Sequence, residues 1–325
     1  MKRSMLNVDE AAKAISQGRR FWLAGEEALL RQLPKGHWIG GTIPYFMEAS
    51  GGVFTRRAIF ATELPESAGK ATTRLYGPEE LPRMTDQAFE YGINCIIIPF
   101  GSEAHFKFAK EAPSYEEILM KPFVGWISGI AVEDIGKISA KVFDGETGEV
   151  SENKAVVMHV ELPSDKPPRI NIINLFKQGA GDEITFDQAG LTVDQCRING
   201  KSTSLADYLL EKKIDTRLPL VADYNGAMIN TSFQSVDRAK GVVLYAPVFE
   251  GIRYKIAAPI GDYAEEFRRA VPASGSEPFF SCNCILNYLY GELEGKITEG
   301  YQGPFTFGEI AFQLLNQTLV YVELT

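Results

Sequence analysis

The run Ile93-Asn94-Cys95-Ile96-Ile97-Ile98 decides the fold class of this chain. It is almost entirely apolar, which is typical of a strand covered on both faces. Upstream, helix and strand patterns alternate: Asn7 with Glu10 opens a helix that ends at Gly18, and Trp38–Ile43 reads as a strand. We therefore predict a central strand over Ile93–Ile98, set among mixed helices and strands.

Beyond Lys137 the pattern changes to short strands joined by tight turns. Ile138–Phe143 leads to the turn signal Asp144-Gly145, and Lys154–Leu162 follows with alternating apolar residues. This spacing is typical of antiparallel pairing. The fold class expected is therefore α+β, that is mixed α/β, with largely antiparallel or mixed sheets and flanking helices.

The length of the chain predicts more than one core. With 325 residues, of which 45% are hydrophobic, it exceeds the usual limit for a single core. The stretch Pro163–Pro168 is the most linker-like, because paired prolines and small polar residues continue neither helix nor sheet. We place the boundary shortly after it and expect two lobes, 1–185 and 186–325.

Charge and hydropathy exclude several classes of protein. A formal net charge of −9 disfavours nucleic-acid partners, since their affinity rests on neutralised phosphates. No apolar run approaches the roughly 20 residues that cross a bilayer. The polar start Asn7-Val8-Asp9-Glu10 does not fit a signal peptide, so we expect a cytoplasmic protein with no membrane partner.

Motifs for cofactors, metals and common catalytic chemistry are missing. Gly291–Thr298 has the wrong spacing for a phosphate-binding loop, and Gly179-Ala180-Gly181 is too short for a dinucleotide site. His37, His105 and His159 have no second ligand at helical spacing. We therefore expect no cofactor and no metal, and assign no catalytic residue.

The segment Phe279-Phe280-Ser281-Cys282-Asn283-Cys284 places thiols at a predicted strand-to-helix junction. Such a junction exposes N–H groups that lower the pKa of a thiol and can receive an anion. Free cysteines are also among the most buried residue types and pack as small apolar side chains. Burial, ligand contact and reactivity are therefore all open for Cys282.

A second segment, Gly303–Ala311, brackets aromatic residues with glycines and places Glu309 before an apolar residue. Glycines allow close backbone approach, and Glu309 could accept hydrogen bonds from an amine or hydroxyl of a ligand. A tight turn with a surface glutamate fits the same residues. Both interpretations stay open from sequence alone.

Together these segments resemble the C-terminal half of the FIST family. The similar elements are Phe280-Ser281-Cys282, then Phe307–Ala311, then Asn316-Gln317-Thr318-Leu319, with Ile198–Lys201 and Ala206–Leu209 upstream and Trp38–Thr42 in the first half. The family often carries Gly and Arg where this chain has Cys284 and Ile285, so an anion contact by that Arg is not carried over.

The resemblance implies a FIST N-like lobe over 1–185, a FIST C-like lobe over 186–325, and an intracellular sensor domain. A stand-alone protein of this kind would bind a small polar metabolite, such as an amino acid, between its lobes and act in signal transduction through a protein partner or as an oligomer. The implied ligand-binding residues are Gly41, Thr42, Ser281, Cys282, Asn283, Gly308 and Glu309, with Glu309 facing a ligand amine. The alternatives are an enzyme with Cys282 as nucleophile and His37 or His159 as base, and a protein-interaction scaffold.

Overall fold

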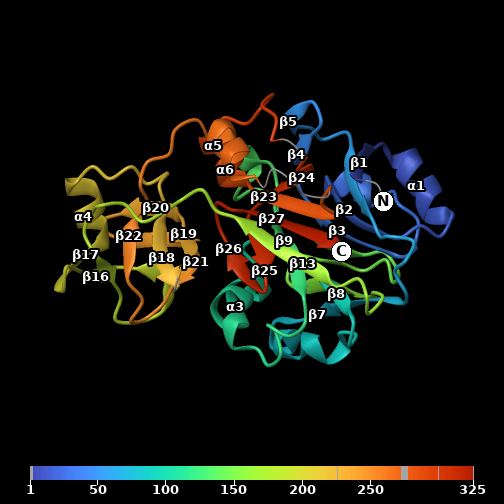
Figure 1. The fold of residues 1–325 in the computed structure, drawn as a ribbon, viewed down its shortest axis with the longest axis horizontal. Helices are drawn as coiled ribbons and strands as arrows, with labels where there is room; N and C mark the ends of the chain where they lie inside the picture. The colour runs from blue at the N-terminus through green and yellow to red at the C-terminus, as the bar shows by residue number, and fades with distance from the viewer. Residues whose placement is uncertain (1–2, 225, 272–276, 299, 325) are drawn as a thin grey trace.

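Three six-stranded sheets form the larger part of the protein, which we call the body (Figure 1). The computed structural model describes residues 3–324 except 225, 272–276 and 299. The first sheet runs, in spatial order, through β1 (Arg3–Leu6), β6 (Ile59–Glu63), β2 (Phe21–Gly25), β3 (Trp38–Thr42), β10 (Val142–Asp144) and β11 (Val150–Ser151). The second runs through β26 (Gln313–Leu315), β25 (Glu309–Ala311), β9 (Phe123–Ser128), β8 (Gly92–Pro99), β12 (Ala155–Glu161) and β7 (Ala71–Tyr76). The third runs through β13 (Pro168–Ile173), β27 (Leu319–Leu324), β23 (Phe280–Cys284), β24 (Gly303–Thr306), β4 (Tyr45–Glu48) and β5 (Gly51–Phe54).

A separate group of strands forms what we call the small lobe, at the left of Figure 1. One sheet contains β17 (Lys201–Ser204), β16 (Gln195–Ile198), β14 (Ile184–Thr185), β22 (Tyr254–Ile256), β18 (Leu220–Tyr224) and β19 (Ala227–Thr231). The other contains β15 (Gly190–Val193), β21 (Gly241–Val248) and β20 (Phe233–Asp237). The small lobe has its own apolar core, which includes Leu209 of α4 (Leu205–Glu211).

The remaining helices lie on the body. The α-helices are α1 (Val8–Ser16), α2 (Glu27–Leu30), α3 (Glu103–Glu111), α5 (Tyr263–Ala270) and α6 (Ile285–Tyr290). The 3₁₀ segments are η1 (Pro78–Gln87), η2 (Ala112–Ser114) and η3 (Val132–Asp134). The capping box predicted at Asn7 and Glu10 is present at the start of α1. None of the helices in the described part of the chain is long and apolar enough to cross a membrane.

The predicted central strand is confirmed. Strand β8 pairs with β9 in parallel and with β12 antiparallel, and every residue in it is buried. The fold class is mixed α+β, as expected, because parallel and antiparallel pairs occur in the same sheets. A near-continuous apolar run forms such a strand because both of its faces must be covered.

The polar stretch Thr85–Tyr91 has a helical pattern in the sequence, and the helix that this pattern predicts is wrong in type and position. The chain instead forms the 3₁₀ segment η1, which ends at Gln87. Pro82 lies inside this segment and has no backbone N–H to donate, so a continuous α-helical ladder cannot form across it.

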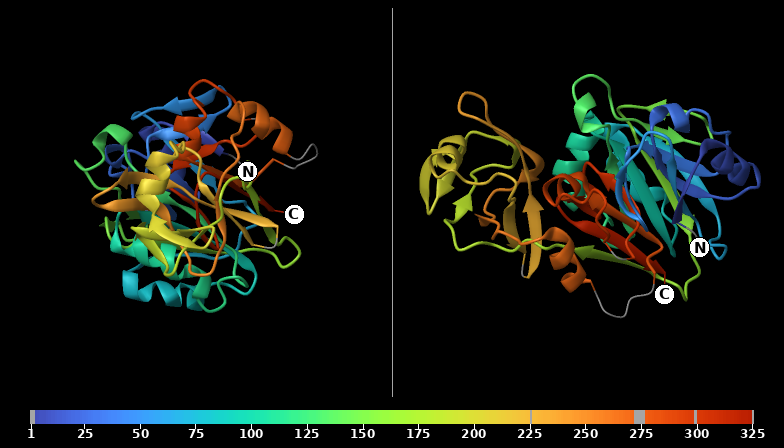
Figure 2. Two further views of the ribbon diagram at one scale, coloured as in Figure 1. Left: turned by 90° about the vertical axis from the view of Figure 1, so that its left-hand side faces the viewer. Right: turned by 90° about the horizontal axis from the view of Figure 1, so that it is seen from above.

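The last strands of the chain return to the body. Strand β27 pairs with β13, β24 with β4, and β25 with β9. Figure 2 shows these red strands beside blue and green ones from the first half. Hydrogen-bonded ladders therefore cross the boundary expected between residues 185 and 186, and the division into lobes 1–185 and 186–325 stays a prediction.

Large aromatic side chains join the three sheets of the body. Trp22 of β2 lies edge-on to Phe280 of β23, with ring centroids 5.5 Å apart. Phe280 in turn stacks on Trp126 of β9 at 5.7 Å. Aromatic contacts of this kind add to the area that they bury, so the core lies where the sheets converge. The junction after β23 is held against this core.

Candidate functional site

The predicted strand-to-helix junction is present where β23 runs into α6. The Asn283 side chain shapes it, because its Oδ1 accepts hydrogen bonds from the Cys284 backbone N–H at 2.7 Å and from the Asn287 amide at 2.9 Å. All of β23 is buried. The junction therefore points inward, towards the body.

Cys282 is a packed core residue. Only 1% of its surface is exposed, and its thiol donates to the Gly125 carbonyl at 3.5 Å. Burial, helped by the nearby Glu309 carboxyl, raises the pKa of the thiol well above its ordinary value. A neutral, enclosed thiol is a poor nucleophile.

The histidines considered as bases for Cys282 are engaged elsewhere. His159 is buried between the Tyr76 hydroxyl at 3.0 Å and the Asn94 side chain at 2.7 Å. Burial lowers its pKa to about 4. His37 is exposed and contacts Glu146 at 2.8 Å. This geometry does not favour the enzyme alternative built on Cys282.

We expect the native protein to react slowly with thiol reagents at pH 7.5, because Cys95, Cys196, Cys282 and Cys284 are all free and buried. The measurement is the time course of thiol modification by Ellman's reagent, with and without about 6 M guanidinium chloride to unfold the protein. All thiols should become reactive only on unfolding. Rapid modification of Cys282 in the native protein, located by mass spectrometry, would contradict this result.

Glu309 is a fully buried carboxyl in β25. Its Oε2 accepts hydrogen bonds from the Thr318 backbone N–H at 3.1 Å and from the Thr318 hydroxyl at 2.7 Å. The Cys284 thiol lies nearby, but no donor completes a hydrogen bond to Oε1 among the described residues. Burial raises the pKa of Glu309 to about 8, although the bonds from Thr318 oppose this. The carboxyl is therefore mostly protonated at neutral pH.

Ser281 and Gly308 serve the packing of the body. The Ser281 hydroxyl donates to the Gln302 carbonyl at 2.8 Å and accepts from the Arg3 guanidinium at 3.1 Å. A Cβ on Gly308 would lie 2.7 Å from Leu314 Cδ1. Both positions are enclosed by the chain itself.

Gly41 and Thr42, at the end of β3, lie against the second sheet, where the backbone N–H of Gly129 donates to the Thr42 carbonyl at 2.7 Å. A Cβ on Gly41 would meet Ile97 Cγ2 at 2.6 Å, so the glycine lets β3 pack on β8. Thr42 is 4% exposed, and its hydroxyl accepts from the Lys141 backbone N–H at 2.9 Å. The crevice beside Thr42 measures about 10 Å³, which is too small for a metabolite.

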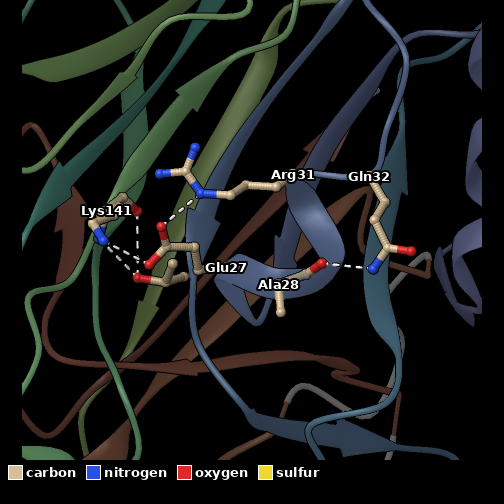
Figure 3. A network of polar contacts seen from close by, with 6 residues as sticks. Glu27, Ala28, Arg31, Gln32 and Lys141 are labelled. Carbon is tan, nitrogen blue, oxygen red and sulfur yellow. Dashed lines mark hydrogen bonds and ion pairs between the residues drawn. The ribbon is translucent and has the colours of Figure 1, made fainter.

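Lys141 also takes part in a surface network (Figure 3). Its ammonium binds Glu27 at 2.6 Å, and Arg31 donates to the same carboxylate at 2.7 Å. Partial burial acts to raise the pKa of Glu27, but the hydrogen bonds from Lys141 and Arg31 outweigh it and hold the pKa below its ordinary value. This network is satisfied within the chain.

A pocket of about 490 Å³ lies between the small lobe and the body. Figure 1 shows α5 and α6 on the side of the body that faces the small lobe. The pocket is lined by Phe176, Asp215, Arg217, Leu218, Pro259, Ile260, Gly261, Asp262, Tyr263, Asn287, Tyr290, Gly291, Glu292, Lys296 and Gln317.

Two buried amide side chains form the polar wall of this inter-lobe pocket. Gln317 links the lobes, since its Nε2 donates to the Arg217 carbonyl at 3.0 Å and its Oε1 accepts from Ser232 at 2.7 Å. Asn287 is 1% exposed, and its Nδ2 donates to Asn283. Its Oδ1 has no hydrogen-bond partner among the described residues. An acceptor left in that state costs about 1 to 3 kcal/mol.

Two of the residues predicted from sequence, Asn283 and Glu309, lie behind this wall. None of Gly41, Thr42, Ser281, Cys282, Asn283, Gly308 and Glu309 lines the inter-lobe pocket. Asn283 holds the amide of Asn287, and Thr318, which binds Glu309, also accepts from that amide at 3.4 Å. As direct ligand contacts all seven residues stay predictions, while Asn283 and, through Thr318, Glu309 support the side chain of Asn287.

Sequence reasoning did not single out Asn287 or Gln317. Asn287 interrupts the otherwise apolar run Ile285-Leu286-Asn287-Tyr288-Leu289-Tyr290, and a polar residue inside such a buried helix is the signal that could have found it. Gln317 lies within the Asn316–Leu319 element of the resemblance.

The part of the chain that the structure describes contains no group of three or more His, Cys, Asp or Glu side chains placed to hold a metal ion. No curated protein matches the chain. A family model matches residues 6–325, nearly the whole sequence. The chain therefore belongs to DUF6976, a family of unknown function.

Proposed function

We propose that this protein binds a small polar metabolite in the inter-lobe pocket and serves as a sensor, as the resemblance to FIST domains implies. The observation that carries the proposal is a pocket of about 490 Å³ whose lining includes Asn287, a side chain with a buried Oδ1 that has no hydrogen-bond partner among the described residues. Ligand pockets are commonly found between lobes, span about 300 to 1,000 Å³, and combine apolar walls with a few placed polar groups.

The pocket has this composition. Leu218 and Ile260 supply apolar wall, while Asn287 and Gln317 supply polar groups. A ligand that donates a hydrogen bond to Asn287 Oδ1 would satisfy an acceptor for which the described part of the chain offers no donor.

Contacts at the inter-lobe pocket give a way for ligand binding to change the arrangement of the two lobes. Arg217 belongs to the small lobe and Asn287 to the body, so one ligand would touch both. A ligand that contacts both lobes favours the arrangement in which both contacts are made. In our proposal that arrangement is read by a protein partner in the cytoplasm.

The test is a thermal-shift screen of amino acids, amines and small carboxylates against the wild type and a Leu218→Trp variant. A compound that binds the inter-lobe pocket should raise the melting temperature of the wild type, because ligands that bind only the native state stabilise it. The larger Trp side chain should abolish that shift. Leu289→Trp is the matched control, since Leu289 is exposed on α6 and does not line the pocket.

Two outcomes would contradict the proposal. The first is a screen in which no compound shifts the wild type. The second is a shift that Leu218→Trp leaves unchanged while circular dichroism shows the variant to be folded. Either result would favour the scaffold alternative, for which the exposed neighbours Leu119 and Met120, at 72% and 79% exposure, are the specific observation.

A further inference from the structure

The charges around the inter-lobe pocket are unequal. Asp215, Asp262 and Glu292 are acidic, and Arg217 and Lys296 are basic. The lining residues therefore carry one negative charge more than they carry positive, and an anionic ligand would meet net repulsion.

Both basic side chains are already engaged. Arg217 donates to both carboxylate oxygens of Asp215, at 2.7 Å to Oδ2 and 3.0 Å to Oδ1. Lys296 donates to Asp262 Oδ2 at 3.1 Å and to the Gly291 carbonyl at 3.2 Å. A ligand carboxylate would have to compete with these contacts.

Asn287, which lines the pocket, carries a buried acceptor without a partner among the described residues. The amide nitrogen of Asn287 donates to Asn283 and to the Thr318 carbonyl, which fixes the amide orientation and leaves Oδ1 without a donor among the residues that the structure describes. Only a donor can satisfy an oxygen acceptor, and an ammonium is a donor in all of its N–H bonds. Exposed Glu292 lies at the same pocket and has no ion-pair partner within 4.0 Å among the described residues.

The rest of the lining suits an apolar stem that carries positive charge. Phe176, Tyr263 and Tyr290 place aromatic rings around the inter-lobe pocket. Aromatic faces attract cations, whereas they do not attract carboxylates. Leu218 and Ile260 give the apolar surface against which methylene groups pack.

We infer that the ligand of this pocket is an organic ammonium compound, with its cationic end held by Asn287 Oδ1 and attracted by Glu292. The inference rests on the proposed function and names the ligand class for the same site. It differs from the sequence-based expectation, in which Glu309 faces the ligand amine.

Isothermal titration calorimetry on the full chain tests this with three compounds that share a four-carbon skeleton: putrescine, 1,4-butanediol and succinate. Putrescine should bind, butanediol should bind more weakly, and succinate should not bind. Asn287→Leu should weaken putrescine binding roughly tenfold or more, since a charged hydrogen bond is lost. Glu292→Gln should weaken it by about two- to fivefold, as for an exposed ion pair.

Glu294→Gln is the matched control, because Glu294 is exposed, lies close in sequence and does not line the pocket. It should leave putrescine binding unchanged. Should Asn287→Leu fail to fold, the comparison of Glu292→Gln with its control still tests whether the pocket binds an organic ammonium compound. Succinate binding as tightly as putrescine, or equal effects of Glu292→Gln and Glu294→Gln, would overturn the ammonium inference and leave the proposed function standing. Absence of binding by all three compounds would overturn the inference, while the wider screen decides the proposed function.

Discussion

A Gly125→Ala variant is expected not to fold, or to lose at least about 4 kcal/mol of unfolding free energy. Gly125 lies in β9 opposite Ile96 of β8, with φ at +156°. A Cβ there would collide with the Ile96 carbonyl oxygen and would lie 2.8 Å from its carbonyl carbon. Backbone atoms of a central sheet cannot move aside cheaply, so the clash separates the strands.

The measurement is chemical denaturation of purified Gly125→Ala, or its yield as soluble protein where none can be purified. Gly181→Ala is the control, because nothing lies within 4 Å of a Cβ at Gly181. That variant should stay within about 0.5 kcal/mol of the wild type, as for ordinary surface substitutions. Wild-type stability of Gly125→Ala would show that β8 and β9 do not approach each other as described.

Replacing Glu309 by Gln should flatten the pH dependence of stability. Below pH 4.5, the ordinary pKa, the carboxyl is protonated in both folded and unfolded chains. Between that value and about 8 it ionises only in the unfolded chain, because burial keeps it protonated in the fold. Its contribution to stability is thus fully present at low pH and is lost as pH rises through this window.

The loss should be on the order of 3 to 5 kcal/mol across the window, at about 1.4 kcal/mol per pH unit. Glutamine cannot ionise, so the Glu309→Gln variant should lack this pH-dependent loss of unfolding free energy. As pH rises from 4.5 to 8, the variant should therefore become more stable relative to the wild type. Urea denaturation of both proteins across this range measures it. The exposed Glu116→Gln serves as control and should follow the wild-type curve. Parallel curves for wild type and Glu309→Gln would show that Glu309 is ionised in the fold.

Local sequence signals predicted local structure well. The apolar run Ile93–Ile98 forms the central strand β8, and the strand-to-helix junction predicted at Phe279–Cys284 is present where β23 meets α6. These features depend on neighbouring residues, whose periodicity and capping groups can be read directly.

Long-range pairing could not be read in the same way. Nothing near Leu319–Leu324 indicates that this strand pairs with Pro168–Ile173, some 150 positions earlier. The lobe boundary and the inter-lobe pocket both depend on such pairings. Gln317 becomes a link between lobes only because Ser232 and Arg217 are brought to it from the small lobe.

The burial of Glu309 was also beyond local reasoning. A charged residue in a Gly-rich segment usually lies at the surface. Here the pairing of β25 with β9 and β26 encloses it, and Thr318 provides its hydrogen bonds. The sequence therefore identified the segment but not the burial of its carboxyl, and contact between Glu309 and a ligand stays a prediction.

Amide hydrogen exchange of the full chain, with and without saturating putrescine, tests the inter-lobe site most directly. Ligand contact with both lobes predicts added protection in the segments 215–218 and 259–263 and around 287–292, which line the pocket. Segments around Gly41 and Thr42 should exchange at the same rate in both states. Protection confined to 38–42, or no change at the pocket when calorimetry shows binding, would contradict the account.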